Sequence, residues 1–423
     1  MANDDGRERH HSGADGLRQR FVFITDELPA AGAAGHLSVN EAIISWLHSL
    51  GHQVDILLTR PRLNWPWQSI DRRFTVAGIG LFTRTGWAIA HRPRDFSRII
   101  GRRIFKQLPA PLSRSLRRTQ REYGGADAVL GSFITPTQIE FCADWVARHN
   151  YDAVLIDTIF RAPVLDDDRL TGAKTLLIAH DLFFRRHRAL GMAGYRLFPE
   201  KLSQADEACL LGRAGAIAAI QPEEAAIIAA MCHSREVVCA PMPATPCPRP
   251  ADQPRVADRL VFIGSASLPN LDGLRWFFES IWPRLRVWRP SVTLDVIGDC
   301  GAAMSHRPDG VAFLGRVKDL APILHQAQLA IAPLRAASGL NIKLLDYARH
   351  GLMTVATPLS LTGFARDDQA PFVAAGDALA FTTAIANALE DRTYRDERAL
   401  DYIARHYDST TSFAGIAQIL GLD

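Results

Sequence analysis

Residues 329–351 read LAIAPLRAASGLNIKLLDYARHG, and they are the most informative segment of the chain. An apolar strand at 329–333 is followed by a turn of small residues, and the spacing after that turn is helical. Such a turn exposes backbone N–H groups at the start of a helix, where they and the helix dipole bind phosphate. Lys343, about one turn into the helix, is placed to neutralise a diphosphate, and Asp346 lies close to the same face, placed to accept hydrogen bonds from ribose. The alternative is an ordinary turn before a helix, with Lys343 and Asp346 as a solvated pair.

The same alternation of strands and helices extends from this stretch along the whole chain. Short apolar runs between polar residues predict strands that are buried on both faces of a parallel sheet. They lie at 21–24, 54–58, 153–156, 175–178, 216–220 and 236–239, and again at 260–264, 293–298, 311–315, 329–333 and 354–357. The predicted fold class is α/β, with two Rossmann-like, doubly wound parallel-sheet domains facing a cleft. Ligands of such sheets bind at the carboxyl ends of the strands.

Prolines mark the boundary between the two predicted domains. Six of them fall between Pro241 and Pro254, and because proline lacks an N–H donor and fixes φ, this stretch is neither helix nor central strand. The predicted organisation is a disordered leader, a first domain, a proline-rich linker, a second domain, and C-terminal helices that pack back on the first domain. The leader spans 1–20, the first domain 21–240 and the linker 241–257. The second domain spans 258–400 and the C-terminal helices 401–423.

The composition is that of a globular protein. The 423 residues are 48% hydrophobic and 22% charged, and the net charge of +3 demands no polyanionic partner. No run approaches the roughly 18 consecutive apolar residues of a transmembrane helix, and 1–20 lacks the apolar core of a secretory signal. Six scattered cysteines without a CxxC pair predict reduced thiols, a cytoplasmic location and no metal site.

The stretch 333–351 resembles the donor-site signature of the family 4 retaining glycosyltransferases, in the variant P-L-x-x-G-x-G-x-x-x-K-x-x-E-A-x-x-x-G. Four more pieces stand in the family's order, at 262–270, 296–298, 310–320 and 361–364. The resemblance implies the GT-B fold, in which the turn and Lys343 contact the donor diphosphate. Ser338 takes the place of the family's first acid, and Asp346 that of its second. Thr362 stands where the family usually has glutamate.

The resemblance also implies which residues hold a nucleotide-diphosphate sugar. The predicted catalytic residues are Lys343, Asp346 and His180, a histidine after the strand 175–178 that reaches the donor sugar in this family. The alternative for His180 is a histidine hydrogen-bonded in a loop. No metal or cofactor is expected, since cationic groups and N–H groups stabilise the leaving diphosphate. The predicted donor-binding residues are Gly35, Gly264, Ser265, Asn270, Gly298, Gly315, Val317, Arg335, Ser338, Gly339, Asn341, Thr362 and Gly363.

The first half of the chain carries weaker signals. The loop AGAAGH at 31–36 resembles the family's glycine-rich loop at the cleft, although a plain strand-to-helix turn explains it equally well. Its last residue, His36, and Asp157, at the carboxyl end of a strand, are the predicted acceptor contacts. Asp166-Asp167-Asp168 has the D-x-D spacing of metal-dependent transferases, but its polar loop favours a solvated turn.

The segment 84–121 is strongly basic and amphipathic. It holds eleven Arg or Lys residues and one acid, Asp95, interleaved with aromatic and aliphatic residues. Such a segment is typical of peripheral contact with an anionic membrane, here the inner face of the cytoplasmic membrane, and would suit a lipid-linked acceptor. An ordinary basic helix surface is the alternative. Nucleic acid is not an expected partner, because no binding motif accompanies the charge.

The expected activity is transfer of a hexosyl group, with retention of configuration, from a nucleotide-diphosphate sugar to a glycan or lipid-linked acceptor in polysaccharide or glycoconjugate biosynthesis. Two alternatives stay open. One is another enzyme on the same architecture, such as a nucleotide-sugar epimerase, which would need acid–base pairs around the sugar. The other is a non-catalytic paralogue that binds a nucleotide sugar or a partner protein, which Ser338 and Thr362 favour.

Overall fold

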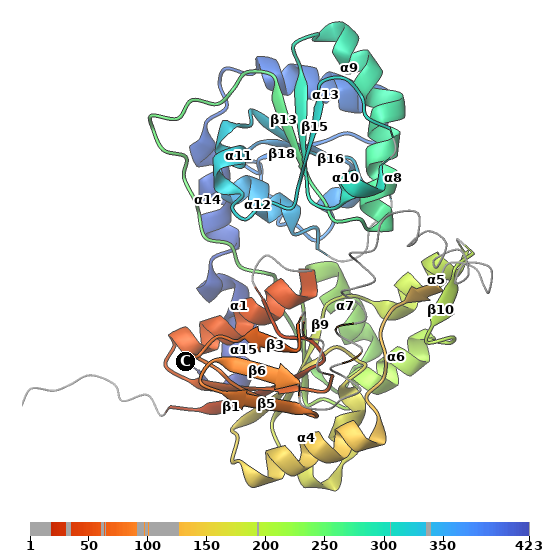
Figure 1. The fold of residues 1–423 in the computed structure, drawn as a ribbon, viewed down its shortest axis with the longest axis vertical. Coiled ribbons are helices and arrows are strands. Elements are labelled where there is room, and N and C mark those ends of the chain that lie inside the picture. The colour runs from red at the N-terminus through yellow and green to blue at the C-terminus, as the bar shows by residue number, and fades with distance from the viewer. Residues whose placement is uncertain are drawn as a thin grey trace, which may run out of the picture.

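The computed structural model describes residues 18–30, 35–60, 63, 65–90, 97, 100, 127–192, 194–304, 306–335 and 340–422. These residues form two α/β lobes, stacked one above the other in Figure 1. The fold class predicted from the sequence is confirmed, and every strand predicted above is present. Most of the predicted leader 1–20 and most of the basic segment 84–121 lie outside the described residues.

The first lobe is built on a seven-stranded sheet in which all neighbours are parallel. Its strands β8 and β9 are buried at every position, as their apolar runs AVLID and TLLIA predict. The strand order is β12 (Glu236–Cys239), β11 (Ala216–Ala219), β9 (Thr175–Ala179), β8 (Ala153–Asp157), β1 (Arg20–Thr25), β2 (Gln53–Leu58) and β4 (Thr75–Gly78). The helical elements of this lobe are α1 (Gly35–Ser49), α4 (Pro136–Arg148), η1 (Ala162–Asp166), η2 (Asp168–Leu170), α5 (Phe183–Met192), α6 (Gln204–Leu211) and α7 (Pro222–Met231).

The second lobe repeats the plan on a six-stranded parallel sheet. Its strand order is β15 (Val311–Gly315), β14 (Thr293–Ile297), β13 (Arg259–Ile263), β16 (Leu329–Ala332), β17 (Thr354–Ala356) and β18 (Phe372–Ala374). Its helical elements are α8 (Leu268–Trp276), the π-helical turn η3 (Phe277–Ile281), α9 (Trp282–Trp288), α10 (Cys300–Ala303), α11 (Ala321–Gln326), α12 (Lys343–Arg349), η4 (Pro358–Leu361) and α13 (Ala378–Glu390).

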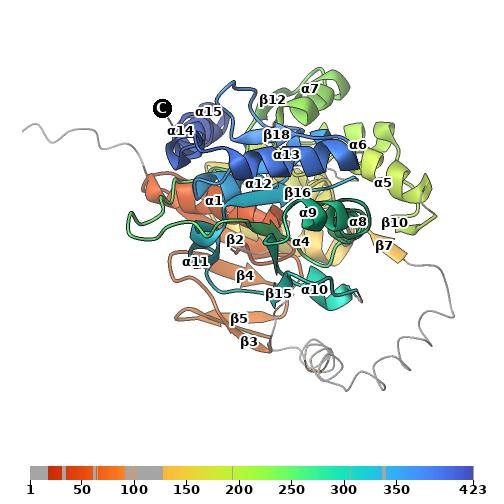
Figure 2. The ribbon, with the colours of Figure 1, turned by 90° about the horizontal axis from the view of Figure 1, so that it is seen from above.

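Two small sheets belong to the first lobe. Strands β10 (Arg196–Phe198) and β7 (Asp127–Val129) pair in parallel. Strands β3 (Trp67–Ser69), β6 (Trp87–Ala90) and β5 (Leu81–Arg84) form an antiparallel sheet that stands at the edge of the molecule when it is seen from above (Figure 2). The sequence analysis did not predict these short strands, nor β4 and β18.

The C-terminal helices run from the second lobe to the first. Helix α14 (Asp396–His406) packs beside α12, and α15 (Ser409–Leu420) packs on β11 and β12 of the first lobe (Figure 1). The ring centroids of Phe413 on α15 and Trp46 on α1 are 5.0 Å apart, and Lys174 Nζ donates to the carbonyl of Leu420 at 3.2 Å. The lobes are therefore joined by two crossings of the chain, the proline-rich stretch and the α14–α15 connection.

Candidate active site

Helix α12 presents Lys343 at the carboxyl end of the second sheet. The buried Tyr347 fixes the helix there, because its hydroxyl oxygen accepts the backbone N–H of Ile263 at 2.7 Å. Lys343 Nζ donates to Asn270 Oδ1 at 2.6 Å and lies 4.4 Å from the ring centroid of Phe262. Burial lowers the pKa of Lys343 to about 7. In the described part of the chain no carboxylate forms an ion pair with this amine, so an incoming anion meets an uncompensated cation.

Glycines directly after β13 and β14 line the strand ends near Lys343. Gly298 has φ +103°, and a Cβ there would lie 2.2 Å from the carbonyl oxygen of Gly264. A Cβ at Gly264 would in turn lie 2.6 Å from Phe262 Cε1. Asn270 Nδ2 donates to the carbonyl of Ser265 at 3.0 Å, which connects this rim to Lys343. Glycine at these two positions therefore lets the ends of β13 and β14 approach each other closely beside Lys343.

Three more predicted donor-site residues lie on the same side of the lobe. Asp346 is half-buried, 4.0 Å from Arg349 Nη1, and burial raises its pKa to about 6. Asn341 Nδ2 is buried and has no hydrogen-bond partner among the described residues. Arg335 is exposed and forms a two-point ion pair with Asp272, at 2.6 and 3.1 Å, so part of its guanidinium is already engaged.

The other predicted donor residues are more dispersed. Gly315 ends β15 with φ +69°, and Val317 is partly buried against the apolar cluster that contains Val261 and Leu324. Thr362 is exposed. Ser338 and Gly339, in the centre of the predicted anion-binding turn, lie outside the described residues.

In the first lobe, His180 and Asp157 form a buried pair at the carboxyl ends of β9 and β8. His180 Nε2 lies 3.1 Å from Asp157 Oδ1, and Thr25 Oγ1 donates to Asp157 Oδ2 at 2.8 Å. Burial by itself would raise the pKa of Asp157, but the hydrogen bond from His180 and the charge of Arg161 hold it well below its usual range. Asp157 was predicted as an acceptor contact, and in the structure its two carboxylate oxygens are hydrogen-bonded to His180 and Thr25.

The pair with Asp157 leaves one nitrogen of His180 available. A carboxylate only accepts, so Nε2 carries a proton, and Nδ1 is buried without a partner among the described residues. The ring of His36, near the start of α1, meets that of His180 edge-on at 6.0 Å between centroids, and burial lowers the pKa of His36. In the neutral imidazole, His180 Nδ1 is therefore a hydrogen-bond acceptor that no described residue occupies.

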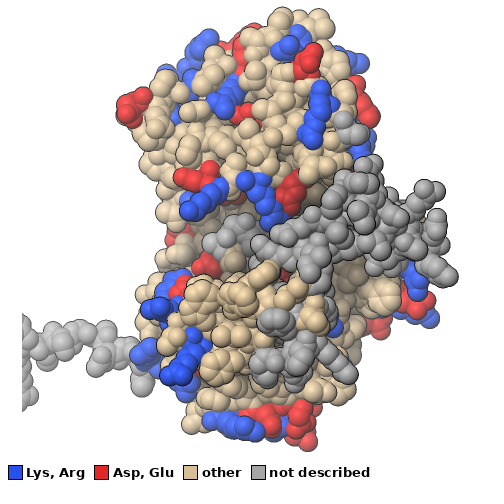
Figure 3. Space-filling model, in the orientation of Figure 1, with Lys and Arg blue, Asp and Glu red and all other residues tan. Residues whose placement is uncertain are grey.

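Two contacts join these groups across the lobes. Gly35, the first residue of α1, lies close to Ile342, the residue that precedes Lys343. A Cβ added at Gly35 would lie 3.2 Å from Ile342 Cδ1. A Cβ at Gly363, where φ is +85°, would lie 2.5 Å from Gln221 Oε1. The start of α1, with His36, thus meets the start of α12. Charged side chains of both signs lie along the edge of the upper lobe that faces the lower one (Figure 3). The structure brings together two predicted groups, one around His180 and one around Lys343.

The D-x-D spacing does not form an open acidic site. Asp167 accepts the backbone N–H of Arg169 at 3.1 Å and pairs with its guanidinium at 2.7 Å. Asp166 pairs with Arg213 at 2.9 Å. The turn interpretation of this segment agrees with these contacts.

Sequence reasoning missed a group of buried acids beside His180. Glu207 accepts the backbone N–H groups of Phe183 and Phe184, at 3.0 and 2.6 Å, where α5 begins. Glu224 is buried, and its Oε2 has no described partner. Burial raises the pKa of Glu207 to about 7 and that of Glu224 to about 8. No spacing in the sequence distinguishes these two glutamates from surface helix residues.

Replacement of Glu224 by glutamine is expected to stabilise the protein at pH 8 and to change little at pH 5. The unfolded carboxyl has a pKa near 4.5, so between pH 4.5 and about 8 only the folded state holds the proton. Stability therefore falls as pH rises through this window, by up to roughly 5 kcal/mol for such a rise in pKa, since one pKa unit is about 1.4 kcal/mol. Thermal unfolding of Glu224→Gln at both pH values measures this, and exposed Glu223→Gln is the control. If Glu224→Gln and Glu223→Gln changed the melting temperature equally at pH 8, Glu224 would not be a buried acid with a raised pKa.

Comparison with known proteins agrees with this architecture. Residues 257–391 match the family model described as Glycosyl transferases group 1. A Klebsiella pneumoniae protein described as "Uncharacterized 44.6 kDa protein in cps region" is 24% identical over 172 residues. That match covers 37% of this chain and 44% of the other, so it spans less than half of the relative's length.

Solved structures match over nearly the whole chain. Sucrose-phosphate synthase from Thermosynechococcus elongatus has a TM-score of 0.65 at 14% identity, covering 96% of this chain and 99% of that one. WaaG, a glycosyltransferase involved in lipopolysaccharide biosynthesis, has a TM-score of 0.57 at 14% identity, covering 95% and 100%. A structure described as trehalose-6-phosphate from E. coli bound with UDP-2-fluoro glucose also reaches 0.57 at 14% identity, covering 95% and 99%.

The chain has the GT-B fold of these glycosyltransferases. Its second lobe matches the Glycosyl transferases group 1, which confirms the resemblance drawn from the sequence.

Proposed function

We propose that the protein is a glycosyltransferase that moves a hexosyl group from a nucleotide-diphosphate sugar to a glycan or lipid-linked acceptor, with retention of configuration. The observation that carries the proposal is Lys343. Its amine lies at the start of a helix, among bare glycine backbones, with no anionic partner in the described part of the chain. A leaving diphosphate is the ligand that such a corner would stabilise. The match with a structure bound to UDP-2-fluoro glucose supports the donor class.

The proposed mechanism is electrostatic. Lys343 neutralises charge as it develops on the leaving diphosphate, and the dipole at the start of α12 adds to this. Asp346 accepts hydrogen bonds from the ribose. His180 Nδ1 accepts a hydrogen bond from a hydroxyl group of the transferred sugar, while Asp157 fixes the orientation of the imidazole. These steps use no cofactor, and the acceptor's proton passes to the donor phosphate.

Thermal-shift screening against nucleoside diphosphates and their sugars tests this proposal, because a ligand that binds the folded state raises the melting temperature. The proposal expects one nucleoside diphosphate to stabilise more than its monophosphate. The matching nucleotide sugar should then yield product with an added acceptor. Binding without transfer would favour the non-catalytic paralogue, and interconversion of the sugar without acceptor would favour an epimerase. The absence of any shift across the panel would refute the proposed donor class.

Affinity for the nucleoside diphosphate is expected to weaken as pH rises above about 7. The free Lys343 amine has a pKa of about 7, and bound diphosphate raises it, so binding above pH 7 must take up a proton. The dissociation constant should rise by up to about tenfold per pH unit between 7 and 9, since only the protonated amine carries charge. Calorimetry at pH 6.5, 7.5 and 8.5 measures this. The same slope in Lys343→Met would assign the effect to another group.

We further propose that the first lobe contacts an anionic membrane carrying the acceptor. One face of the antiparallel sheet exposes Trp67, Phe82, Trp87 and Ile89, and register pairs Trp67 with Ile89 and Arg84 with Trp87. Exposed aromatic residues beside the basic sequence 84–121 are typical of interfacial binding. The described residues contain no helix long and apolar enough to cross a membrane.

Co-sedimentation with vesicles tests the membrane contact. The protein is expected to bind vesicles that contain anionic lipid and to be released by salt. Replacement of Trp67 and Trp87 by serine should lower the bound fraction several-fold, because the apolar contribution is lost. Trp288→Ser, which changes a tryptophan that is 50% exposed on the other lobe, is the control. Binding that is the same in all variants would exclude this sheet as the contact.

A further inference from the structure

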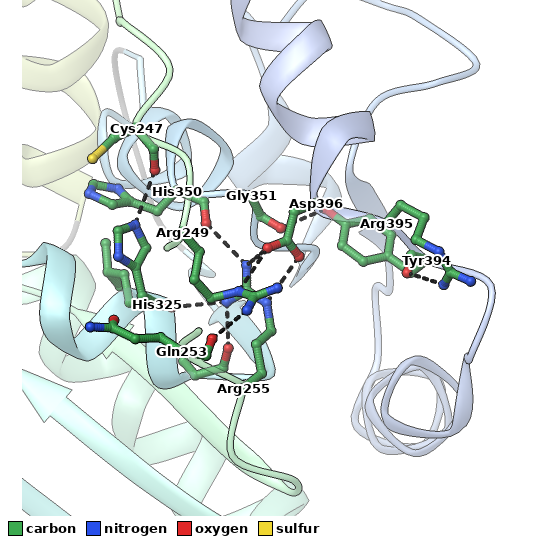
Figure 4. A network of polar contacts seen from close by, with 12 residues as sticks. Cys247, Arg249, Gln253, Arg255, His325, His350, Gly351, Tyr394, Arg395 and Asp396 are labelled. Carbon is green, nitrogen blue, oxygen red and sulfur yellow. Dashed lines mark hydrogen bonds and ion pairs between the residues drawn. The ribbon is translucent and has the colours of Figure 1, made fainter. Parts of the chain in front are cut away.

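One cysteine and two histidines come together between the linker and the second lobe. Cys247 lies in the proline-rich stretch, His325 on α11, and His350 directly after α12 (Figure 4). Their potential ligand atoms all lie within 4.8 Å of one another. Both histidines are buried, while Cys247 is partly exposed. The cluster is separate from the corner around Lys343, since His350 follows the opposite end of α12.

Backbone carbonyls orient both imidazole rings. His350 Nδ1 lies 2.7 Å from the carbonyl oxygen of Asp346, and His325 Nε2 lies 3.1 Å from that of Cys247. A ring nitrogen that donates to a carbonyl carries the proton, which leaves the other nitrogen with its lone pair. Histidines that bind metal ions are held in this way in most proteins.

Ion pairs hold the linker segment against the lobe around this cluster. Arg255 donates to the carbonyls of His350, at 3.1 Å, and Ala327, at 2.7 Å. Arg249 and Arg255 both pair with Asp396, at 3.0 and 3.1 Å (Figure 4). The two arginines are thus engaged with a carboxylate and with carbonyls. The three side chains are kept near one another by contacts that do not depend on an ion.

We propose that Cys247, His325 and His350 form a zinc site. A thiolate with two imidazoles is a ligand set that selects zinc over magnesium or calcium. Tetrahedral zinc, with Zn–N near 2.0 Å and Zn–S near 2.3 Å, separates its ligand atoms by roughly 3.3 to 3.7 Å. From separations of up to 4.8 Å in the structure, the ligand atoms would have to approach one another by about 1 Å to bind zinc. Water completes the fourth position. The ion would fasten the interlobe linker to the helix that begins with Lys343.

This inference changes the prediction of no metal that was drawn from sequence spacing. Metal motifs are recognised when ligands lie a few residues apart, but Cys247 and His325 are separated by 78 positions. Only the fold brings them together. The proposed ion would lie at the opposite end of α12 from Lys343. The electrostatic role of Lys343 does not depend on it.

Metal uptake by the reduced, full-length protein tests the proposal. The wild type, stripped with a chelator and dialysed, is expected to bind about one zinc ion per chain. Cobalt in its place should give the near-ultraviolet absorption of a cobalt–thiolate bond and the visible bands of a tetrahedral ion. Cys247→Ser should lose the thiolate absorption and bind zinc at least about tenfold more weakly, because a hydroxyl is a poor zinc ligand.

Cys209→Ser is the matched control, since Cys209 is an exposed thiol on α6, outside the cluster. It should keep the stoichiometry and the spectrum of the wild type. Zinc should also raise the melting temperature of the wild type and of Cys209→Ser, but not that of Cys247→Ser. The proposal is overturned if the wild type takes up no stoichiometric zinc, or if Cys247→Ser retains the thiolate absorption. Neither result bears on sugar transfer.

Discussion

Replacement of Lys343 by methionine is expected to lower kcat about 100- to 1000-fold, which corresponds to roughly 3–4 kcal/mol of lost transition-state stabilisation. The leaving diphosphate gains negative charge as the glycosidic bond breaks, and Lys343 Nζ is the described cation at the start of α12. Methionine keeps the length and apolar packing of the side chain against Phe262 but removes the charge. The measurement is single-turnover transfer from the donor found by screening, together with the affinity for the free nucleoside diphosphate.

The fold should survive this substitution, and that separates catalysis from stability. Burial lowers the pKa of Lys343 to about 7, against 10.5 for an ordinary lysine. Below pH 7 the amine is charged in both states, and the cost of burying that charge lowers the stability of the fold. Between pH 7 and 10.5 the unfolded state binds more protons than the folded state, so stability rises with pH and the cost disappears. The melting temperature of Lys343→Met at pH 7 should therefore equal or exceed that of the wild type. Lys201→Ala, at an exposed lysine of the first lobe, is the control for activity. A variant that keeps both kcat and nucleotide affinity would remove the basis of the proposed function.

The sequence predicted the scaffold well because parallel sheets buried on both faces require continuous apolar strands. Strands such as β8 and β9 can be predicted from their own sequences, AVLID and TLLIA, without any knowledge of the neighbouring strands. The short strands β3, β5 and β6 were missed because their exposed and buried positions mix aromatic, polar and basic residues. Their pairing depends on long-range contacts, which local periodicity does not record.

The site could be predicted only as far as its motif reached. Lys343 and the glycines at 264 and 298 follow strands directly, so the rule that ligands bind at strand ends places them correctly. The partners of these residues could not be predicted. Nothing in the sequence shows that Asn270 accepts from Lys343, that Asp272 holds Arg335, or that Asp157 is turned towards His180. Such pairings arise between segments far apart in the chain, and they decide whether a side chain is free for a ligand.

Removal of the His180 imidazole is the second large effect that the structure leads us to expect. His180→Ala should lower transfer about 100-fold, the lower end of the range for a positioned side chain that exchanges hydrogen bonds with the reacting groups. The affinity for the nucleoside diphosphate should stay within about twofold, since the first-lobe site would contact the sugar and not the phosphates. Exposed His233→Ala is the control. If His180→Ala weakens nucleotide binding as strongly as transfer, the imidazole does not act on the sugar.

The dependence of His180 on Asp157 can be tested with the neutral isostere. In Asp157→Asn the amide can donate to His180 Nε2, which moves the imidazole proton to Nδ1 and removes the acceptor that we assign to the sugar hydroxyl. Transfer should fall about 10- to 100-fold, and nitrogen-15 NMR of the imidazole should report the changed tautomer. The two residues touch, so their effects should not add. The double variant Asp157→Asn/His180→Ala should transfer no more slowly than His180→Ala alone, whereas additive losses would show that Asp157 contacts the substrate independently, as the sequence had predicted for it.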